Sequence, residues 1–215
     1  MTAQPTPAPR ARAEAAARPL LRGVSHQVAF VASLAVGALL IVKAHGAAGN
    51  VAAAVFAASV ASMFLASALY HRVRWSPRAR LVMRRVDHSA IYALIAGSYT
   101  PFGLLVLHGS WRIAVLSIVW SGAACAALLK VLWVGAPKWL AAVLGIGLGW
   151  VGIVAAPQIV GALGLAGTLL LVGGGVLYTV GGVIYARRRP DPVPAIFGYH
   201  EVFHALVIAA VALQY

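Results

Sequence analysis

Residues 67–92, SALYHRVRWSPRARLVMRRVDHSAIY, join the end of one apolar segment to the start of the next through an arginine-rich loop. Ser67 and His71 stand four residues apart at the end of the first segment, so they share one face of a helix. Asp87 and His88 stand at the start of the second segment. Apolar helices joined by a basic loop, with ionisable groups beside it, are typical of a membrane protein with an internal polar site.

The composition of the whole chain also indicates a membrane protein. Of the 215 residues, 62% are hydrophobic and 10% are charged, whereas a soluble domain carries about 25% charged residues. The net charge of +13 could suggest nucleic acid, but the basic residues form short clusters between apolar runs. We therefore expect membrane lipids as partners and no nucleic acid, while protein partners and the oligomeric state stay open.

Seven segments are apolar and long enough to be spanning helices, which need about 20 mainly apolar residues. They are residues 28–44, 51–70, 86–107, 112–132, 139–156, 159–186 and 196–213. We expect one seven-helix transmembrane domain over residues 25–215, after a disordered, basic, Ala- and Pro-rich tail at residues 1–24. Only Pro157 and Gln158 separate the fifth and sixth segments, and the sixth is long enough to tilt.

The basic residues predict the orientation of these helices. Lys43 and Arg112 fall on one side of the membrane. All the others fall on the opposite side, in the tail and in the loops after the second, fourth and sixth segments: Arg10, Arg12, Arg18, Arg22, Arg72, Arg74, Arg78, Arg80, Arg84, Arg85, Lys130, Lys138, Arg187, Arg188 and Arg189. The positive-inside rule therefore predicts a cytoplasmic N-terminus and an external C-terminus.

This topology brings polar residues of three segments to one depth. The second segment ends at the cytoplasmic side with Ser67 and His71, the third begins there with Asp87, and the seventh begins there with His200 and His204. Ionisable groups are costly at membrane depth and mark functional sites. The topology thus predicts that three imidazoles and one carboxylate meet near the inner leaflet.

Three histidines with one open position are a known arrangement for catalytic zinc, and imidazole favours zinc over magnesium or calcium. Asp87 could hold a zinc-bound water, act as a general base or orient a ligand. Ser67 could donate a hydrogen bond to a developing oxyanion. Zinc lowers the pKa of bound water to about 7, which would make hydroxide available at neutral pH.

The same residues also have structural interpretations. Asp87 could meet a helix N-terminus or pair with Arg84 or Arg85, and Ser67 could bond to its own helix backbone. The remaining histidines are expected to be structural or to meet the membrane interface: His26, His45, His88 and His108.

The sequence HEVFH at residues 200–204 fits HExxH, in which two histidines bind zinc and the glutamate is the base of a protease. No histidine or acid follows His204, so a third ligand must come from upstream, and His71 is the candidate. We expect two zinc ligands here without a protease base at Glu201. An intramembrane HExxH protease stays open as an alternative.

Three stretches resemble the hemolysin III family, the bacterial branch of the progestin and adipoQ receptor superfamily. They are SALYHR at 67–72, DHSAIYALIAGSYTPF at 87–102 and GYHEVFH at 198–204. The resemblance implies a multi-pass protein of the bacterial cytoplasmic (inner) membrane. It also implies zinc held by His71, His200 and His204. Asp87 corresponds to the family aspartate, which reaches the zinc through water, and Ser67 corresponds to the family serine. Related adiponectin receptors carry glutamine in place of Glu201, which argues against a base there.

Alkaline ceramidases share this set of one serine, one aspartate and three histidines. The resemblance therefore implies a zinc-dependent hydrolase of lipid amides or esters that acts in membrane homeostasis, with Asp87 and Ser67 as catalytic residues. A non-catalytic sensor or receptor of membrane state, with structural zinc, is the main alternative. A pore-forming hemolysin is a weaker one, because few charges beyond the cluster could line a pore.

Overall fold

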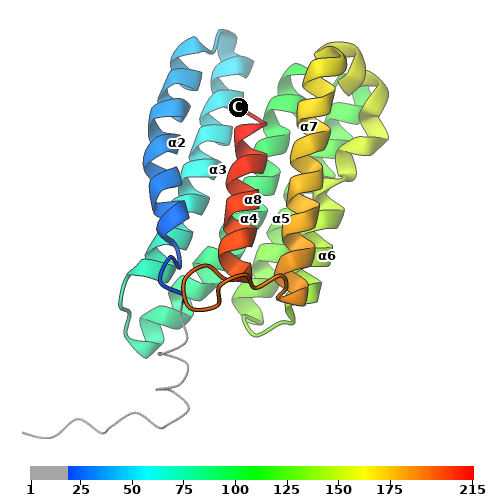
Figure 1. Cartoon of the computed structure of the whole chain (residues 1–215). Coiled ribbons are helices and arrows are strands. Elements are labelled where there is room, and N and C mark those ends of the chain that lie inside the picture. Colours follow the sequence, from blue (N-terminus) through cyan, green and yellow to red (C-terminus); the bar gives the residue numbers. More distant parts are fainter. Residues whose placement is uncertain (1–18) are drawn as a thin grey trace, which may run out of the picture.

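The computed structural model describes residues 19–215, which fold into α-helices and one short 3₁₀ helix (Figure 1). Within this part of the chain there is no β-strand, only an isolated bridge between Val193 and Phe197. The all-helical prediction is confirmed. The elements are α2 (Val24–Lys43), α3 (Gly46–Arg72), α4 (Pro77–Leu105), α5 (Gly109–Leu132), α6 (Lys138–Gly149), η1 (Val151–Ala155), α7 (Ala156–Arg187) and α8 (Tyr199–Ala212).

The outer surface of the bundle is that of a membrane protein. Large aliphatic side chains face outward along the helices, for example Val31 at 65% and Leu169 at 61% exposure, and soluble monomers rarely expose such continuous apolar surface. Four stretches of the described chain are long and apolar enough to cross a bilayer: Val24–Lys43, Gly46–Arg72, Gly109–Leu132 and Lys138–Arg187.

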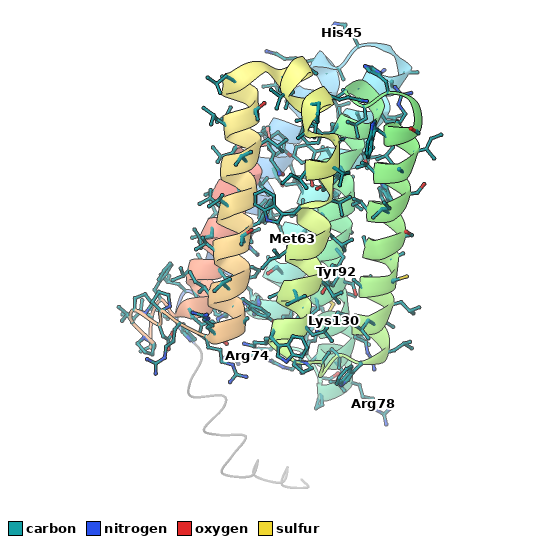
Figure 2. The ribbon with its side chains drawn as sticks, turned by 90° about the vertical axis from the view of Figure 1, so that its right-hand side faces the viewer. His45, Met63, Arg74, Arg78, Tyr92 and Lys130 are labelled. Atoms are coloured by element: carbon teal, nitrogen blue, oxygen red, sulfur yellow. The ribbon has the colours of Figure 1, made fainter. Side chains whose placement is uncertain are left out.

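The two ends of the bundle differ in charge. The loops α3–α4, α5–α6 and α7–α8 lie at the end where the described chain begins, and the C-terminus lies at the other end (Figure 1). Figure 2 places Arg74, Arg78 and Lys130 toward the first end and His45 at the opposite one. The first end is called the basic end below.

Helix α4 begins earlier than the sequence predicted. The third apolar segment was expected from residue 86, but the helix starts at Pro77. Ser76 caps it, because its hydroxyl accepts a hydrogen bond from the Ala79 N–H at 3.3 Å, and proline is favoured at the first helical position. Asp87 therefore lies well inside α4 rather than in its first turn, so it does not serve as a helix N-terminal carboxylate.

The predicted boundary at Pro157 and Gln158 is wrong. Pro157 stands in the first turn of α7, where a missing N–H costs nothing. The helical path breaks at Gly164 instead, whose φ of 64° and ψ of −173° are open mainly to glycine. After this break α7 runs back along α6, so that Gly175 lies against Trp150 and Gly182 against Ile146. Residues 159–186 are thus not one tilted helix.

The segment just before α2 is part of the folded structure. The Leu20 and Leu21 N–H groups donate to the carbonyls of Ala195 and Ile196 at 2.9 and 3.1 Å. This pairing holds the α7–α8 loop against the start of α2. Residues 1–18 of the predicted tail lie outside the described residues.

Helix α4 packs into both parts of the core. Tyr92 and Ala96 pack with Val115 and Val119 of α5. Leu94 packs with Val60 of α3 and with Val207 and Val211 of α8 in a second cluster. Helix α4 therefore stands between the two halves of the bundle and carries Asp87 between them.

Candidate metal centre

Helices α3 and α8 bring three histidines together at the basic end. His71 stands in the last turn of α3, and His200 and His204 are one turn apart at the start of α8. One ligand nitrogen from each ring lies within 4.8 Å of the others. The Nε2 atoms of His71 and His200 are 3.1 Å apart. The spacing of four residues on α8 places both of its imidazoles on the face toward α3.

The histidine cluster is shielded from the surface. His200 is 8% exposed and His204 is 2% exposed. The Nδ1 atoms of both rings have no hydrogen-bond partner in the described structure. Buried polar atoms without partners lower stability. The His200 nitrogen that faces His71 is Nε2, so an ion shared by these two rings would bind there and not at Nδ1.

The donor set fits zinc. Imidazole nitrogens bind zinc at about 2.0–2.1 Å, so two of them on one ion are at most about 4.2 Å apart. The 3.1 Å separation between His71 and His200 lies inside this limit. The three nitrogens as a set lie within 4.8 Å of one another, an upper bound slightly above this limit. Three such ligands leave a tetrahedral position open.

Asp87 and Ser67 lie beside the histidine cluster. Ser67 stands one turn before His71 on α3, is 3% exposed and forms a hydrogen bond with the Asp87 carboxylate. The Asp87 side chain is 11% exposed, and its Oδ2 lies 4.0 Å from His88 Nε2. It forms no ion pair with Arg84 or Arg85 among the described residues. Three helices therefore bring the five predicted site residues to one place.

A fourth histidine joins the cluster, and the sequence did not assign it there. His26 of α2 is 2% exposed and its ring stacks on that of His204. The expectation that His26 meets the membrane interface is wrong. Because α2 begins at Val24, His26 lies in its first turn, at the same end as the other site residues. The first apolar segment was predicted to begin at residue 28, so His26 was placed outside the helix. His45 and His108 are exposed at helix starts.

Glu201, between the two α8 histidines, faces the N-terminal segment. Its Oε2 accepts the Gly198 N–H at 2.9 Å, which is the glutamate half of a capping box at the start of α8. Its Oε1 forms an ion pair with Arg22. This carboxylate is 1% exposed and engaged on both oxygens, which is the geometry of a structural residue.

A cavity of about 480 Å³ extends from the histidine cluster through the bundle. Its polar wall lies near the basic end and includes Ser67, Asp87, His200 and His204. Apolar side chains such as Leu107 and Ile159 line the part toward the other end. The volume lies within the range of about 300–1,000 Å³ that is usual for small-molecule sites.

The fold and site define a helical membrane protein with a histidine cluster at one end of an apolar cavity. The chain belongs to the haemolysin-III related family, and the match covers residues 15–215. It is 30% identical over 199 residues to the hemolysin-3 homolog of Bacillus subtilis (strain 168), covering 91% of this chain and 90% of that protein. It is 31% identical over 199 residues to hemolysin-3 of Bacillus cereus, covering 91% and 88%. No solved structure matched the chain. The family predicted from the three motifs is confirmed.

Proposed function

We propose that this protein is a zinc-dependent hydrolase that cleaves an amide or ester bond of a lipid in the bacterial cytoplasmic membrane. One observation carries the proposal: His71, His200 and His204 converge within 4.8 Å beside a cavity that also holds Ser67 and Asp87. A metal-ligating set, a carboxylate and a hydroxyl are what water-dependent acyl transfer needs. The apolar remainder of the cavity suits acyl chains.

The proposed topology is seven spans with the N-terminus in the cytoplasm and the C-terminus outside. It is supported by the basic residues gathered at one end of the bundle and by the positive-inside rule (Figure 2). The fifth span would comprise α6, η1 and the start of α7, and the sixth would follow Gly164. The site would then lie near the cytoplasmic leaflet, where a lipid headgroup linkage can enter from the side.

Each site residue has a part in this scheme. His71, His200 and His204 would hold zinc, which supplies a Lewis acid and makes hydroxide available near neutral pH. Asp87 orients the attacking water and accepts its proton. Ser67 donates its one hydroxyl proton to the Asp87 carboxylate and so fixes the orientation of that carboxylate.

The test is release of fatty acid from a ceramide-like lipid by the purified protein. We expect turnover that is lost on chelation, restored by zinc, and absent in His204→Ala. His108→Ala, at an exposed helix start, is the matched control and should keep full turnover. Undiminished hydrolysis by metal-free protein would overturn the proposal.

A second candidate is a non-catalytic sensor of membrane state with structural zinc. The ligands come from α3 and α8, so an ion there would tie together two helices far apart in sequence. This function predicts that His71→Ala lowers the Tm while the wild type shows no turnover. Metal-free protein with the Tm of the native form would exclude it. Pore formation ranks below both, because the cavity wall is mostly apolar.

A further inference from the structure

Lys130 is a buried lysine on the wall of the cavity. It stands in the last turn of α5, is 3% exposed and lines the cavity with Asp87 and His88. Lysines near a membrane interface normally extend their ammonium groups to water or headgroups. Lys130 stays inside the bundle instead, and it is the one lysine or arginine among the described residues that line this cavity.

No acid of the described chain pairs with Lys130. The Asp191 side chain accepts the Tyr199 N–H, and Glu201 is engaged by Arg22 and Gly198. Asp87, the third acid within residues 19–215, is bonded to Ser67. Helix dipoles favour lysine near a C-terminus, but no hydrogen bond joins this ammonium to a carbonyl of α5. Lys130 therefore lines the cavity with no acid of the described chain paired to it, and an ammonium in this position is suited to a charge-assisted hydrogen bond with an anionic ligand.

The surrounding charges strengthen this expectation. Arg84, Lys130 and Lys138 are all close enough to act electrostatically on His88, so positive charge is in excess here. Lys138 is already engaged, because its Nζ donates to the Tyr199 hydroxyl at 2.5 Å. The same group lies over the rings of Tyr185 and Tyr199, at 4.8 and 4.6 Å from their centroids. Lys130 is therefore the cation that remains for a ligand in the cavity.

We propose that Lys130 binds the anionic group, a carboxylate or phosphate, of an acyl lipid whose chain occupies the apolar part of the cavity. The site thereby selects anionic lipid amides or esters over neutral ones. The inference rests on the proposed function for the reaction and names its substrate class. Lys130 is a binding and specificity residue, and Asp87 and the histidines remain the reacting machinery.

The test uses three lipid amides with the same acyl chain: N-acylethanolamine, which is neutral, its phosphate, and N-acylglycine. Dissociation constants are measured by displacement of radiolabelled N-acylglycine from the purified, zinc-loaded protein. We expect both anionic lipids to bind about tenfold or more tightly than the neutral one, as for a hydrogen bond to a charged group. Preference for only one anion would support the proposal and identify the group.

Lys130→Met should weaken the binding of both anionic lipids to the level seen for the neutral lipid. The dissociation constant of the neutral lipid should stay unchanged. Lys130→Gln gives a second loss-of-charge variant should the first fail to fold, and Lys130→Arg should keep the preference. Lys43→Met, at the other end of the bundle, is the matched control. Equal zinc content would show that the metal site is intact. A folded Lys130→Met or Lys130→Gln protein that keeps the preference would overturn the inference.

Hydrolysis of the same lipids separates this inference from the proposed function. A protein that binds anionic lipids through Lys130 but cleaves none supports the binding role and refutes the hydrolase. Zinc-dependent cleavage of all three lipids at equal rates, unchanged in Lys130→Met, refutes the binding role and supports the hydrolase.

Discussion

The imidazole of His26 stacks on that of His204, with ring centroids 3.7 Å apart and planes 13° from parallel. His26 also packs against Phe64 of α3, at 5.0 Å between ring centroids. Helix α2 thus braces a candidate metal ligand of α8 from the side. A ring held in this way loses less rotational freedom when it binds an ion.

Replacing His26 by alanine should weaken zinc binding by about 10- to 100-fold, the usual cost of losing a group that orients a ligand. Zinc affinity is measured by competition with a chromophoric chelator. His26→Phe keeps the stacked ring and should retain most of the affinity, and His45→Ala, at an exposed position, should retain all of it. Equal affinities for His26→Ala and the wild type would show that the stack has no role at the metal.

The triple variant with alanine at His71, His200 and His204 should purify without zinc, whereas the wild type should carry one ion per chain. The reason is that no other set of three histidine, cysteine or acidic ligands converges in the described residues. Elemental analysis of dialysed protein measures this directly. The same zinc content in both proteins would place the metal elsewhere and end the hydrolase and structural-zinc interpretations together.

Glu201→Gln should destabilise the protein without removing its zinc or its turnover. The change leaves Arg22 without its carboxylate in a buried pair, and breaking such a pair costs about 3–5 kcal/mol. Thermal unfolding followed with zinc content and lipid hydrolysis per folded molecule checks this. An Arg22→Met, Glu201→Leu double variant should recover part of the Tm. Lost turnover at unchanged stability would instead assign Glu201 a chemical role and revive the HExxH protease.

The topology predicts which positions a membrane-impermeant maleimide can reach in intact cells. In a Cys125→Ala background, cysteine at His45 or Gly161 should be labelled from outside, since both lie toward the end with few basic residues. Gly161 has open space for a side chain. Cysteine at Ser76 or Arg189 should react only after the membrane is permeabilised. Labelling of Ser76→Cys and Gly161→Cys from the same side would contradict the seven-span arrangement.

Gly164→Ala should lower the free energy of unfolding by about 1–3 kcal/mol, because its φ of 64° and ψ of −173° are reached almost only by glycine. Gly161→Ala, in helical backbone of the same element, should be neutral or slightly stabilising. Thermal unfolding of both variants measures the difference. Equal Tm values would mean that Gly164 does not make the break within α7 that brings this helix back along α6.

Several features of the site were predictable from local pattern alone. The alternation of apolar segments and basic loops sets the direction in which each helix crosses the membrane. This direction determines how deep each residue of the helix lies. This is why Ser67, His71, Asp87, His200 and His204 could be assigned to one end before any contact was known. The cap at Ser76 and Pro77 was missed, although a serine followed by proline is a signal for a helix start.

The sequence by itself determined the helical membrane class, the family and five of the residues that meet at the basic end, because hydropathy and charge act along the chain. Only the tertiary structure decided that His26 stacks on His204, that Arg22 engages Glu201, that Lys130 lines the cavity without an acid partner, and that the chain turns at Gly164. These outcomes depend on how helices rotate and pack against one another. Packing is set by the shapes of side chains distant in sequence, which no local pattern records.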